Sequence, residues 1–162
     1  MRTSTKLPGY DGKAACIADK ARLKYFKYPD GRYIMHCDCW TPNLQPARGT
    51  SVREDWIEVN LWEPKLVREV VVQGCTDFEK QWVAAFKVQY TYDGLVWHWL
   101  GHRNKGTEFK GAHRGSSVVR TPVDIPFKAR KVRVYPTRCI AEDGVVPTCA
   151  MRFEVFMQEV PT

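Results

Sequence analysis

The alternation of apolar and polar residues from Asp55 onward is the feature that most constrains the fold. Apolar side chains stand at every second position in residues 57–61, 86–90, 132–134 and 151–155. Successive side chains of a β-strand point to opposite faces, so this period is typical of strands with one buried face. No stretch sustains a helical stripe over three turns. The alternation therefore predicts an all-β chain.

Turn signals separate these runs. A polar residue followed by Gly or Pro stands at 63–64, 73–74, 93–94, 110–111 and 143–144. Several short strands joined by such turns form a β-sandwich or a barrel. In the last strand the alternation places Met151, Phe153 and Val155 inward, and it places Arg152 and Glu154 outward.

The first third of the chain has a different character. Residues 8–54 are rich in Gly, Pro, Tyr and charge and show little periodicity. Long loops in a compact domain are usually functional. With 162 residues the chain fits one domain, so residues 1–162 are predicted to form a rigid barrel that carries large loops at one end.

Charge and cysteine content narrow the range of partners. The net charge of +7 favours acidic partners: sulfated glycans, anionic lipids or nucleic acid. The even number of cysteines favours three disulfides and an extracellular location, although reduced cytosolic thiols are the alternative. Nucleic acid is therefore not expected as a partner. The first ten residues lack the apolar centre of a signal peptide, so a secreted protein would here be a mature or recombinant form.

Neither an enzyme nor a metal site is predicted. The chain has no G-x-S-x-G, no H-E-x-x-H and no phosphate-binding glycine loop. His36, Cys37 and Cys39 offer three soft ligands within four residues, but no second cysteine pair follows to complete a zinc site. No cofactor is expected, and a role for calcium stays open.

An ordered set of short motifs carries a family resemblance. They are Ala-Arg-Leu at 21–23, Trp-Thr-Pro at 40–42, Trp-Ile-Glu-Val-Asn-Leu at 56–61, Gln-Gly-Cys at 73–75, Val-Gln-Tyr at 88–90 and Ala-Arg-Lys-Val-Arg-Val-Tyr-Pro-Thr at 129–137. Together they resemble the discoidin family, also called coagulation factor V/VIII C-type domains. The resemblance implies a galactose-binding-like jelly-roll of about eight strands with ligand-binding loops, called spikes, at one end. It also implies non-catalytic binding of cell-surface glycans, anionic phospholipid or proteins.

The sequence departs from the family pattern at three places. Asn60 and Trp62 stand where the family commonly has Asp and Gly. Met157 and Gln158 replace a terminal Gly-Cys, so the disulfide that usually joins the two ends of the domain is absent. Gln45 falls about where an aspartate of some members holds a C-terminal arginine, so that specificity is not expected here.

The resemblance also bears on the disulfides. One family member joins a cysteine just before the loop Trp to one after the Gln-Gly motif, which implies Cys39, or its rival Cys37, with Cys75. Cys139 and Cys149 bracket a short loop that a disulfide would close. Cys16 and Cys37 are then the remaining pair for a third disulfide. Six cysteines allow 15 different connectivities.

The loop end is the first candidate binding surface. Its candidate ligand-binding residues are Tyr10, Asp11, Lys13, Tyr33, Ile34, Met35, His36, Arg48, Phe78 and Glu79. Aromatic rings can stack on a sugar while polar groups bind its hydroxyls. Ile34, Met35 and Phe78 also suit insertion into an anionic phospholipid membrane, or packing between the loops.

A basic surface is the second candidate. Residues 98–138 carry ten Lys or Arg against only Glu108 and Asp124. The candidate patch comprises His102, Arg103, Lys105, Lys110, His113 and Arg114. It could bind heparan sulfate, or the charges could simply be solvated. We expect an extracellular recognition and adhesion module that binds a cell-surface glycan or glycoprotein through the loop end; phospholipid and heparan sulfate binding are the alternatives.

Overall fold

The computed structural model describes residues 2–3, 56–74, 81–114, 117–144 and 150–157, and within these ranges every regular element is a strand. The strands are β1 (Arg2–Thr3), β2 (Ile57–Gln73), β3 (Gln81–Thr91), β4 (His98–Trp99), β5 (Phe109–Lys110), β6 (Val118–Ala141) and β7 (Arg152–Met157). All pairings are antiparallel. No helix in these ranges is long and apolar enough to cross a membrane.

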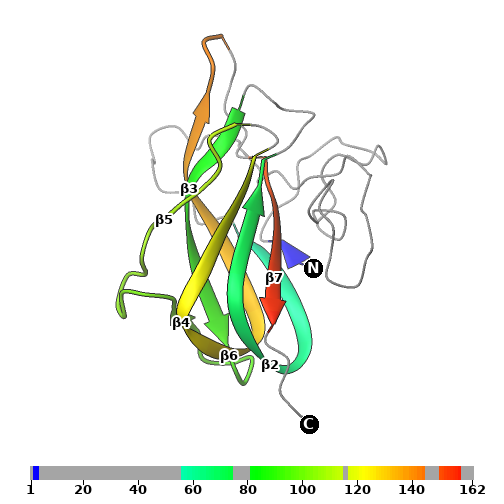
Figure 1. Ribbon diagram of the computed structural model, residues 1–162. Coiled ribbons are helices and arrows are strands. Elements are labelled where there is room, and N and C mark those ends of the chain that lie inside the picture. The colour runs from blue at the N-terminus through cyan, green and yellow to red at the C-terminus, as the bar shows by residue number, and fades with distance from the viewer. Residues whose placement is uncertain (1, 4–55, 75–80, 115–116, 145–149, 158–162) are drawn as a thin grey trace, which may run out of the picture.

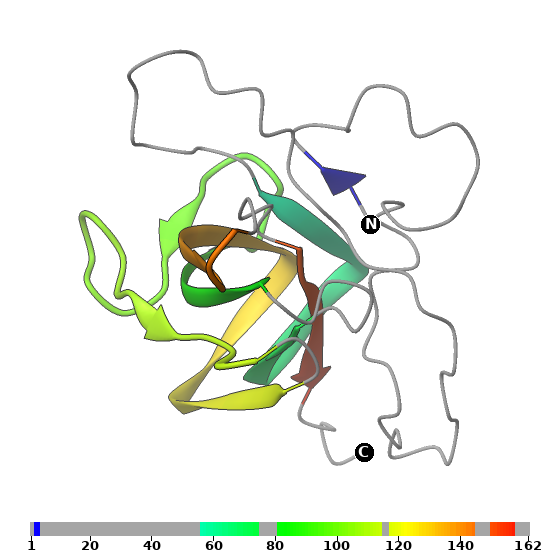
Figure 2. The same cartoon turned by 90° about the horizontal axis from the view of Figure 1, so that it is seen from above.

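The two long strands, β2 and β6, each take part in both layers of the fold. The sheet order is β1-β2-β6-β3-β4, with β5 on β3 and β7 on β2. In one layer, residues 57–60 of β2 pair with β6, and residues 131–141 of β6 pair with β3. In the other layer, residues 69–73 of β2 lie between β7 and residues 118–122 of β6. Both strands therefore bend from one layer into the other, as Figures 1 and 2 show. The result is the jelly-roll architecture expected from the sequence.

The bends coincide with prolines. The register of β2 against β6 shifts between Asn60 and Lys65, which brackets Pro64, and again beside the β6 segment 122–127, which holds Pro122 and Pro126. Proline cannot donate to the ladder, so it is tolerated where the pairing is interrupted. The turn signal at 63–64 thus marks a corner within β2 and not its end.

The core lies between the two layers and follows the alternation seen in the sequence. Ile57, Phe86, Val132, Val134 and Phe153 are all fully buried, and they belong to a single cluster that draws on both layers. Burying such a side chain contributes about 1.5–3 kcal/mol each. Along β6 the polar neighbours of these residues are exposed or half-buried, which confirms the predicted faces.

One expectation for the last strand is wrong. Met151, Phe153 and Val155 point into the core as predicted, but Arg152 is 0% exposed and Glu154 only 7%. The outer face of this layer is therefore buried as well, at Val71 and Gln73 of β2 and at their partners on β7. Alternation identifies the two faces of a strand but does not show that both are covered. The two-residue strand β1, paired with Ile57 and Glu58, was not expected either.

Candidate functional site

The residues predicted to bind ligand at the loop end all lie outside the described residues. They are Tyr10, Asp11, Lys13, Tyr33, Ile34, Met35, His36, Arg48, Phe78 and Glu79. The described strands show where segment 75–80 departs and returns, because β2 ends at Gln73 and β3 begins at Gln81. Both strand ends lie at the upper end of the barrel in Figure 1. Segment 75–80, which holds Phe78 and Glu79, therefore leaves β2 and enters β3 at this end of the barrel.

A buried polar group supports the backbone where β2 ends. The guanidinium of Arg152 donates from Nη1 to the carbonyl oxygen of Gly74 at 3.3 Å. Gln73 and Gln81 are also buried there, with 3% and 4% of their surface exposed. Buried polar groups are retained where hydrogen bonds satisfy them. Arg152 therefore fixes the residue at which the chain leaves β2.

The cysteines are tested at one position. Cys139, on β6, is disulfide-bonded. The remaining cysteines lie outside the described residues, so the pairings stay predictions: these are Cys16, Cys37, Cys39, Cys75 and Cys149. The three soft ligands near His36 lie outside as well. Within the described ranges no three His, Cys, Asp or Glu side chains gather as metal ligands.

The basic patch is exposed along its whole length. His102, Arg103 and Lys105 lie in the connection from β4 to β5, Lys110 lies on β5, and His113 and Arg114 lie in the turn that follows. Each of the six is exposed. From β4 the connection runs up one side of the barrel (Figure 1) and returns to β3 through the pairing of Lys110 with Ala85. The patch is thus a ribbon of basic side chains beside β3.

The loop that carries His102, Arg103 and Lys105 is closed by its own hydrogen bonds. Thr107 N donates to Leu100 O at 3.0 Å, and Gly106 N donates to His102 O at 2.8 Å. The hydroxyl oxygen of Thr107 accepts from His102 N at 2.9 Å. Gly106 has a φ of 73°, and a Cβ there would lie 2.7 Å from Cε3 of Trp99. The loop can therefore pack on that indole only because residue 106 is glycine.

A further cation, which the sequence reasoning missed, joins this loop to the sheet. The ammonium of Lys87, on β3, donates to Lys105 O at 2.9 Å and lies 5.8 Å from the centre of the Trp99 ring. Trp99 in turn packs against Tyr135, and the centres of the two rings are 5.3 Å apart. Lys87 is polar at an outward position of the alternation, but nothing local in the sequence shows that a loop 18 residues away reaches it.

Comparison with known proteins decides the family. The family model described as "F5/8 type C domain" matches residues 36–155. The chain belongs to this family. Rat (Rattus norvegicus) lactadherin is 34% identical over 95 residues, covering 58% of this chain and 22% of lactadherin. Human (Homo sapiens) neuropilin-2 is 31% identical over 134 residues, covering 75% of this chain and 14% of neuropilin-2. This F5/8 type C chain thus spans less than a quarter of either relative.

Solved structures share the fold. Wild-type discoidin II from Dictyostelium discoideum superposes with a TM-score of 0.72 at 20% identity, covering 99% of this chain and 55% of that one. A family 32 CBM from C. perfringens NanJ, solved in complex with galactose, has a TM-score of 0.57 at 13% identity and covers 94% and 91% of the two chains. At these identities the likeness establishes the discoidin-like jelly-roll, as the sequence predicted.

Proposed function

We propose that this F5/8 type C domain is a non-enzymatic, extracellular recognition module that binds a cell-surface glycan through its loop end. The observation that carries the proposal is the shared fold with the NanJ domain, whose structure holds galactose. We further propose that residues 1–162 form one domain of a longer protein, because the relatives are several times longer than the matched region.

The described part of the chain provides the rigid support that such a site needs. A binding site on loops is effective when a packed scaffold holds the loop ends in place. Here the buried Arg152 holds Gly74, and the fully buried Phe86 and Phe153 anchor β3 and β7 in the core. Aromatic and polar side chains in the loops, such as Tyr33 and Asp11, would stack on and hydrogen-bond the sugar.

A second candidate is a sulfated glycan on the basic patch. What favours it is the closed loop at 100–107, which presents His102, Arg103 and Lys105 on a fixed backbone next to Lys87. Preorganised cations lose less conformational entropy on binding than cations on a flexible chain. Attraction between such exposed charges weakens as salt is added.

The two candidates are separated by a screen against neutral and sulfated glycans near physiological salt, with and without calcium. Selective binding to a neutral sugar supports the loop end. Binding restricted to sulfated glycans, and lost steeply as salt rises, supports the basic patch. A blank screen contradicts both, and anionic liposomes are then the next ligand to test.

Matched variants assign the surface. Tyr10→Ala with Tyr33→Ala is expected to abolish binding of a neutral sugar, whereas Arg103→Glu with Lys105→Glu leaves it unchanged. The reverse result assigns the glycan to the basic patch. If liposomes bind, replacing Ile34, Met35 and Phe78 with Ser should abolish that binding and preserve sugar binding. Unchanged liposome binding in this triple variant argues against membrane insertion.

A further inference from the structure

Three reversals of the chain gather at the lower end of the barrel in Figure 1. They are the corner of β2 at residues 60–65, the connection from β3 to β4 at residues 92–97 and the corner of β6 at residues 122–127. The strand register brings them together, because Asn60 and Thr91 both stand opposite Lys131, one on each side of β6. These three reversals are called the turn end below.

Large apolar side chains project into solvent from all three reversals. Leu95 is 83% exposed, Ile125 81% and Trp62 79%, and more than half of Tyr92 and of Val96 is exposed as well. Within the described ranges, no other large hydrophobic side chain is as exposed as these five. Single apolar residues are normal on a surface, whereas a group of this size at one end of a domain marks an interaction site.

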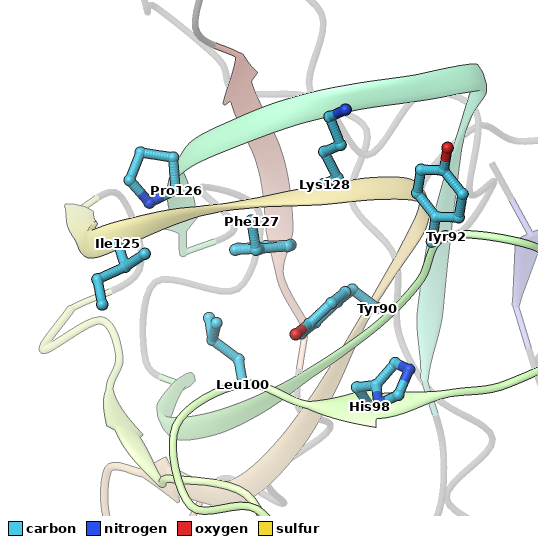
Figure 3. Close-up of a pocket in the computed structure, with 8 residues that line it drawn as sticks. All are labelled: Tyr90, Tyr92, His98, Leu100, Ile125, Pro126, Phe127 and Lys128. Carbon is cyan, nitrogen blue, oxygen red and sulfur yellow. The ribbon is translucent and has the colours of Figure 1, made fainter.

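The corner of β6 presents its apolar side chain on a rigid base. Tyr92 and Ile125 border the same open hollow. Figure 3 shows Ile125 and Pro126 at one end of the corner and Tyr92 beside the continuation of the strand, with Lys128 between them. The next residue after Pro126 is Phe127, which is buried in the core. A surface anchored in this way gains contacts on binding without first ordering the chain.

The indole of Trp62 is held outward at a conformational cost. Its φ is 70°, in the left-handed region that side chains other than glycine rarely adopt. The side chain of Asn60 fixes this turn, because its Oδ1 accepts a hydrogen bond from Trp62 N at 2.8 Å. Strain of this kind persists mainly where function requires it. Tryptophan, with an apolar ring and a polar N–H group, is the side chain enriched at the boundary between lipid and water.

Basic side chains surround these apolar groups. Arg68, Lys128 and Arg130 are exposed, and none of them makes a hydrogen bond or an ion pair within the described part of the chain. They lie on the segments of β2 and β6 that adjoin the two corners, where Leu66 stands opposite Lys128. A second copy of the chain would bring these cations against its own, which opposes a dimer through this end. An anionic surface is attracted to them.

The acids of the turn end offset little of this charge. Glu63 is paired with Lys65, and Oδ1 of Asp93 accepts the amide groups of Leu95 and Val96. Asp124 is the third acidic residue of the reversals. Three cations without an ionic partner therefore stand against one such carboxylate.

We propose that the turn end docks on an anionic lipid surface. Trp62, Leu95 and Ile125 enter the boundary between the headgroups and the acyl chains. Arg68, Lys128 and Arg130 meet the anionic headgroups. This surface differs from Ile34, Met35 and Phe78, the side chains considered above for membrane insertion, and it does not depend on which glycan the domain binds.

Cosedimentation of the intact chain with vesicles tests the proposal. We expect binding to an equal mixture of phosphatidylcholine and phosphatidylglycerol, and weaker binding to phosphatidylcholine alone. Leu95→Ser with Ile125→Ser should weaken binding to the mixed vesicles by about ten-fold or more, because apolar burial is lost. Ile140→Ser is the matched control and should change nothing, because Ile140 is a partly exposed residue of β6 opposite Trp82, away from the corner.

Two further variants test the indole and the cations. Trp62→Gly should bind the mixed vesicles about five- to ten-fold more weakly although the backbone strain is relieved, so a loss of binding cannot be a loss of folding. Lys128→Gln with Arg130→Gln should weaken binding to the mixed vesicles by about ten-fold and leave binding to phosphatidylcholine unchanged. All these side chains are exposed except Trp82-paired Ile140, which is partly so, and thermal unfolding confirms that each variant folds.

Brominated acyl chains report which residue enters the bilayer. They should quench part of the tryptophan fluorescence of the wild type, and that part should be missing in Trp62→Phe, which keeps an apolar ring and binds normally. Absence of binding to both kinds of vesicle would overturn the proposal, as would equal binding by the Leu95 and Ile125 double variant and the wild type.

Three other results would assign the surfaces differently and would also overturn it. Loss of vesicle binding only in the triple serine variant of Ile34, Met35 and Phe78 would place the membrane contact at those residues. Loss only in Arg103→Glu with Lys105→Glu would place it on the basic patch. A dimer in sedimentation that Leu95→Ser with Ile125→Ser dissociates, without vesicle binding, would identify a second copy of the chain as the partner of the turn end.

Discussion

Glu58 and Arg133 stand directly opposite each other on β2 and β6, and Arg133 Nε donates to Glu58 Oε2 at 2.9 Å. The carboxylate is 2% exposed, whereas Arg133 is 22% exposed. The guanidinium carbon lies 4.0 Å from the centre of the Trp56 ring and 3.7 Å from that of Trp97. One arginine therefore neutralises a buried acid and joins β2, β6 and the connection between β3 and β4.

This arrangement predicts a large cost for Arg133→Ala. The substitution leaves the Glu58 carboxylate buried, and among the described side chains only the Lys131 ammonium, at 3.9 Å, then remains near it as a cation. We expect a loss of about 2–3 kcal/mol in the free energy of unfolding, measured by urea denaturation. Arg133→Lys should lose about 1 kcal/mol, because the charge stays and the flat stack between two indoles is lost.

Arg130→Ala is the control for that series. Arg130 lies on the same strand, is exposed, and makes no hydrogen bond or ion pair within the described part of the chain. Its removal should change the stability by less than about 0.5 kcal/mol. Similar losses for Arg130→Ala and Arg133→Ala would show that the pair with Glu58 does not stabilise the fold.

We expect the hydrogen bonds to Asp93 to make the stability depend on pH. The amide groups of Val96 and Leu95 donate to its Oδ1 at 2.9 and 2.8 Å, and these bonds, with a smaller contribution from Thr91, hold its pKa below the ordinary value. A depressed native pKa contributes stability above the unfolded value, near pH 4, and that contribution disappears as the pH falls through the native pKa.

Replacing Asp93 with Asn should therefore flatten the acid limb of the stability curve. The Asn side-chain oxygen can still accept the two amide bonds, but it has no ionisation to lose. Urea denaturation between about pH 5 and 2 should show a smaller fall for Asp93→Asn than for the wild type. Asp124→Asn removes an exposed carboxylate elsewhere and should leave the slope unchanged. Identical slopes for the Asp93 variant and the wild type would contradict the assignment.

Trp62 is a strained residue that we expect to be replaceable with a gain in stability. Its φ is 70°, which makes it the one non-glycine residue with a positive φ in the described ranges, and it is 79% exposed. The Asn60 side chain supports the turn by accepting from Trp62 N at 2.8 Å. A side chain in this left-handed region costs about 1–2 kcal/mol.

Trp62→Gly should accordingly stabilise the domain by about 0.5–1 kcal/mol, because relief of the strain outweighs the added freedom of the unfolded chain. The glycine also restores the residue common in the family at this place. Thermal unfolding of the variant and the wild type measures this change in stability. A lower melting temperature would mean that the indole makes contacts worth more than the strain.

The strands could be predicted from the sequence because their alternation is local, but the contacts that join them could not. Glu58 and Arg133 are 75 positions apart, and their pairing depends on the register of β2 against β6. The same limit applies to Lys87, whose hydrogen bond reaches Lys105, 18 positions away. The Gly and Pro turn signals correctly located interruptions of the strand pairing, although Pro64 lies at a corner within β2 and not at its end.

We expect Cys139 to form its disulfide with Cys149. Closing a loop of about ten residues restricts the unfolded chain and stabilises the native state by about 2–3 kcal/mol. Cys139→Ser should lower the free energy of unfolding by that amount under oxidising conditions. Peptide mapping without reduction identifies the partner, and a peptide that joins Cys139 to any cysteine other than Cys149 would refute the pairing.

The contact between Gly106 and Trp99 links the stability of the basic loop to its proposed binding role. Gly106→Ala places a Cβ 2.7 Å from the indole at a φ of 73°, so the loop must move away from Trp99 and the Lys87 bond to Lys105 O weakens. Gly94→Ala is the matched control, because its φ is 85° but no atom lies within 4 Å of the added Cβ.

Both variants bear the conformational cost of about 1 kcal/mol, and only Gly106→Ala adds the steric one. Gly106→Ala should therefore unfold at a lower temperature than Gly94→Ala. If the loop binds sulfated glycans as a fixed array of cations, Gly106→Ala should also elute from a heparin column at lower salt, even though no charge has changed. Equal elution of the two variants would show that charge alone, and not the fixed loop, determines the affinity.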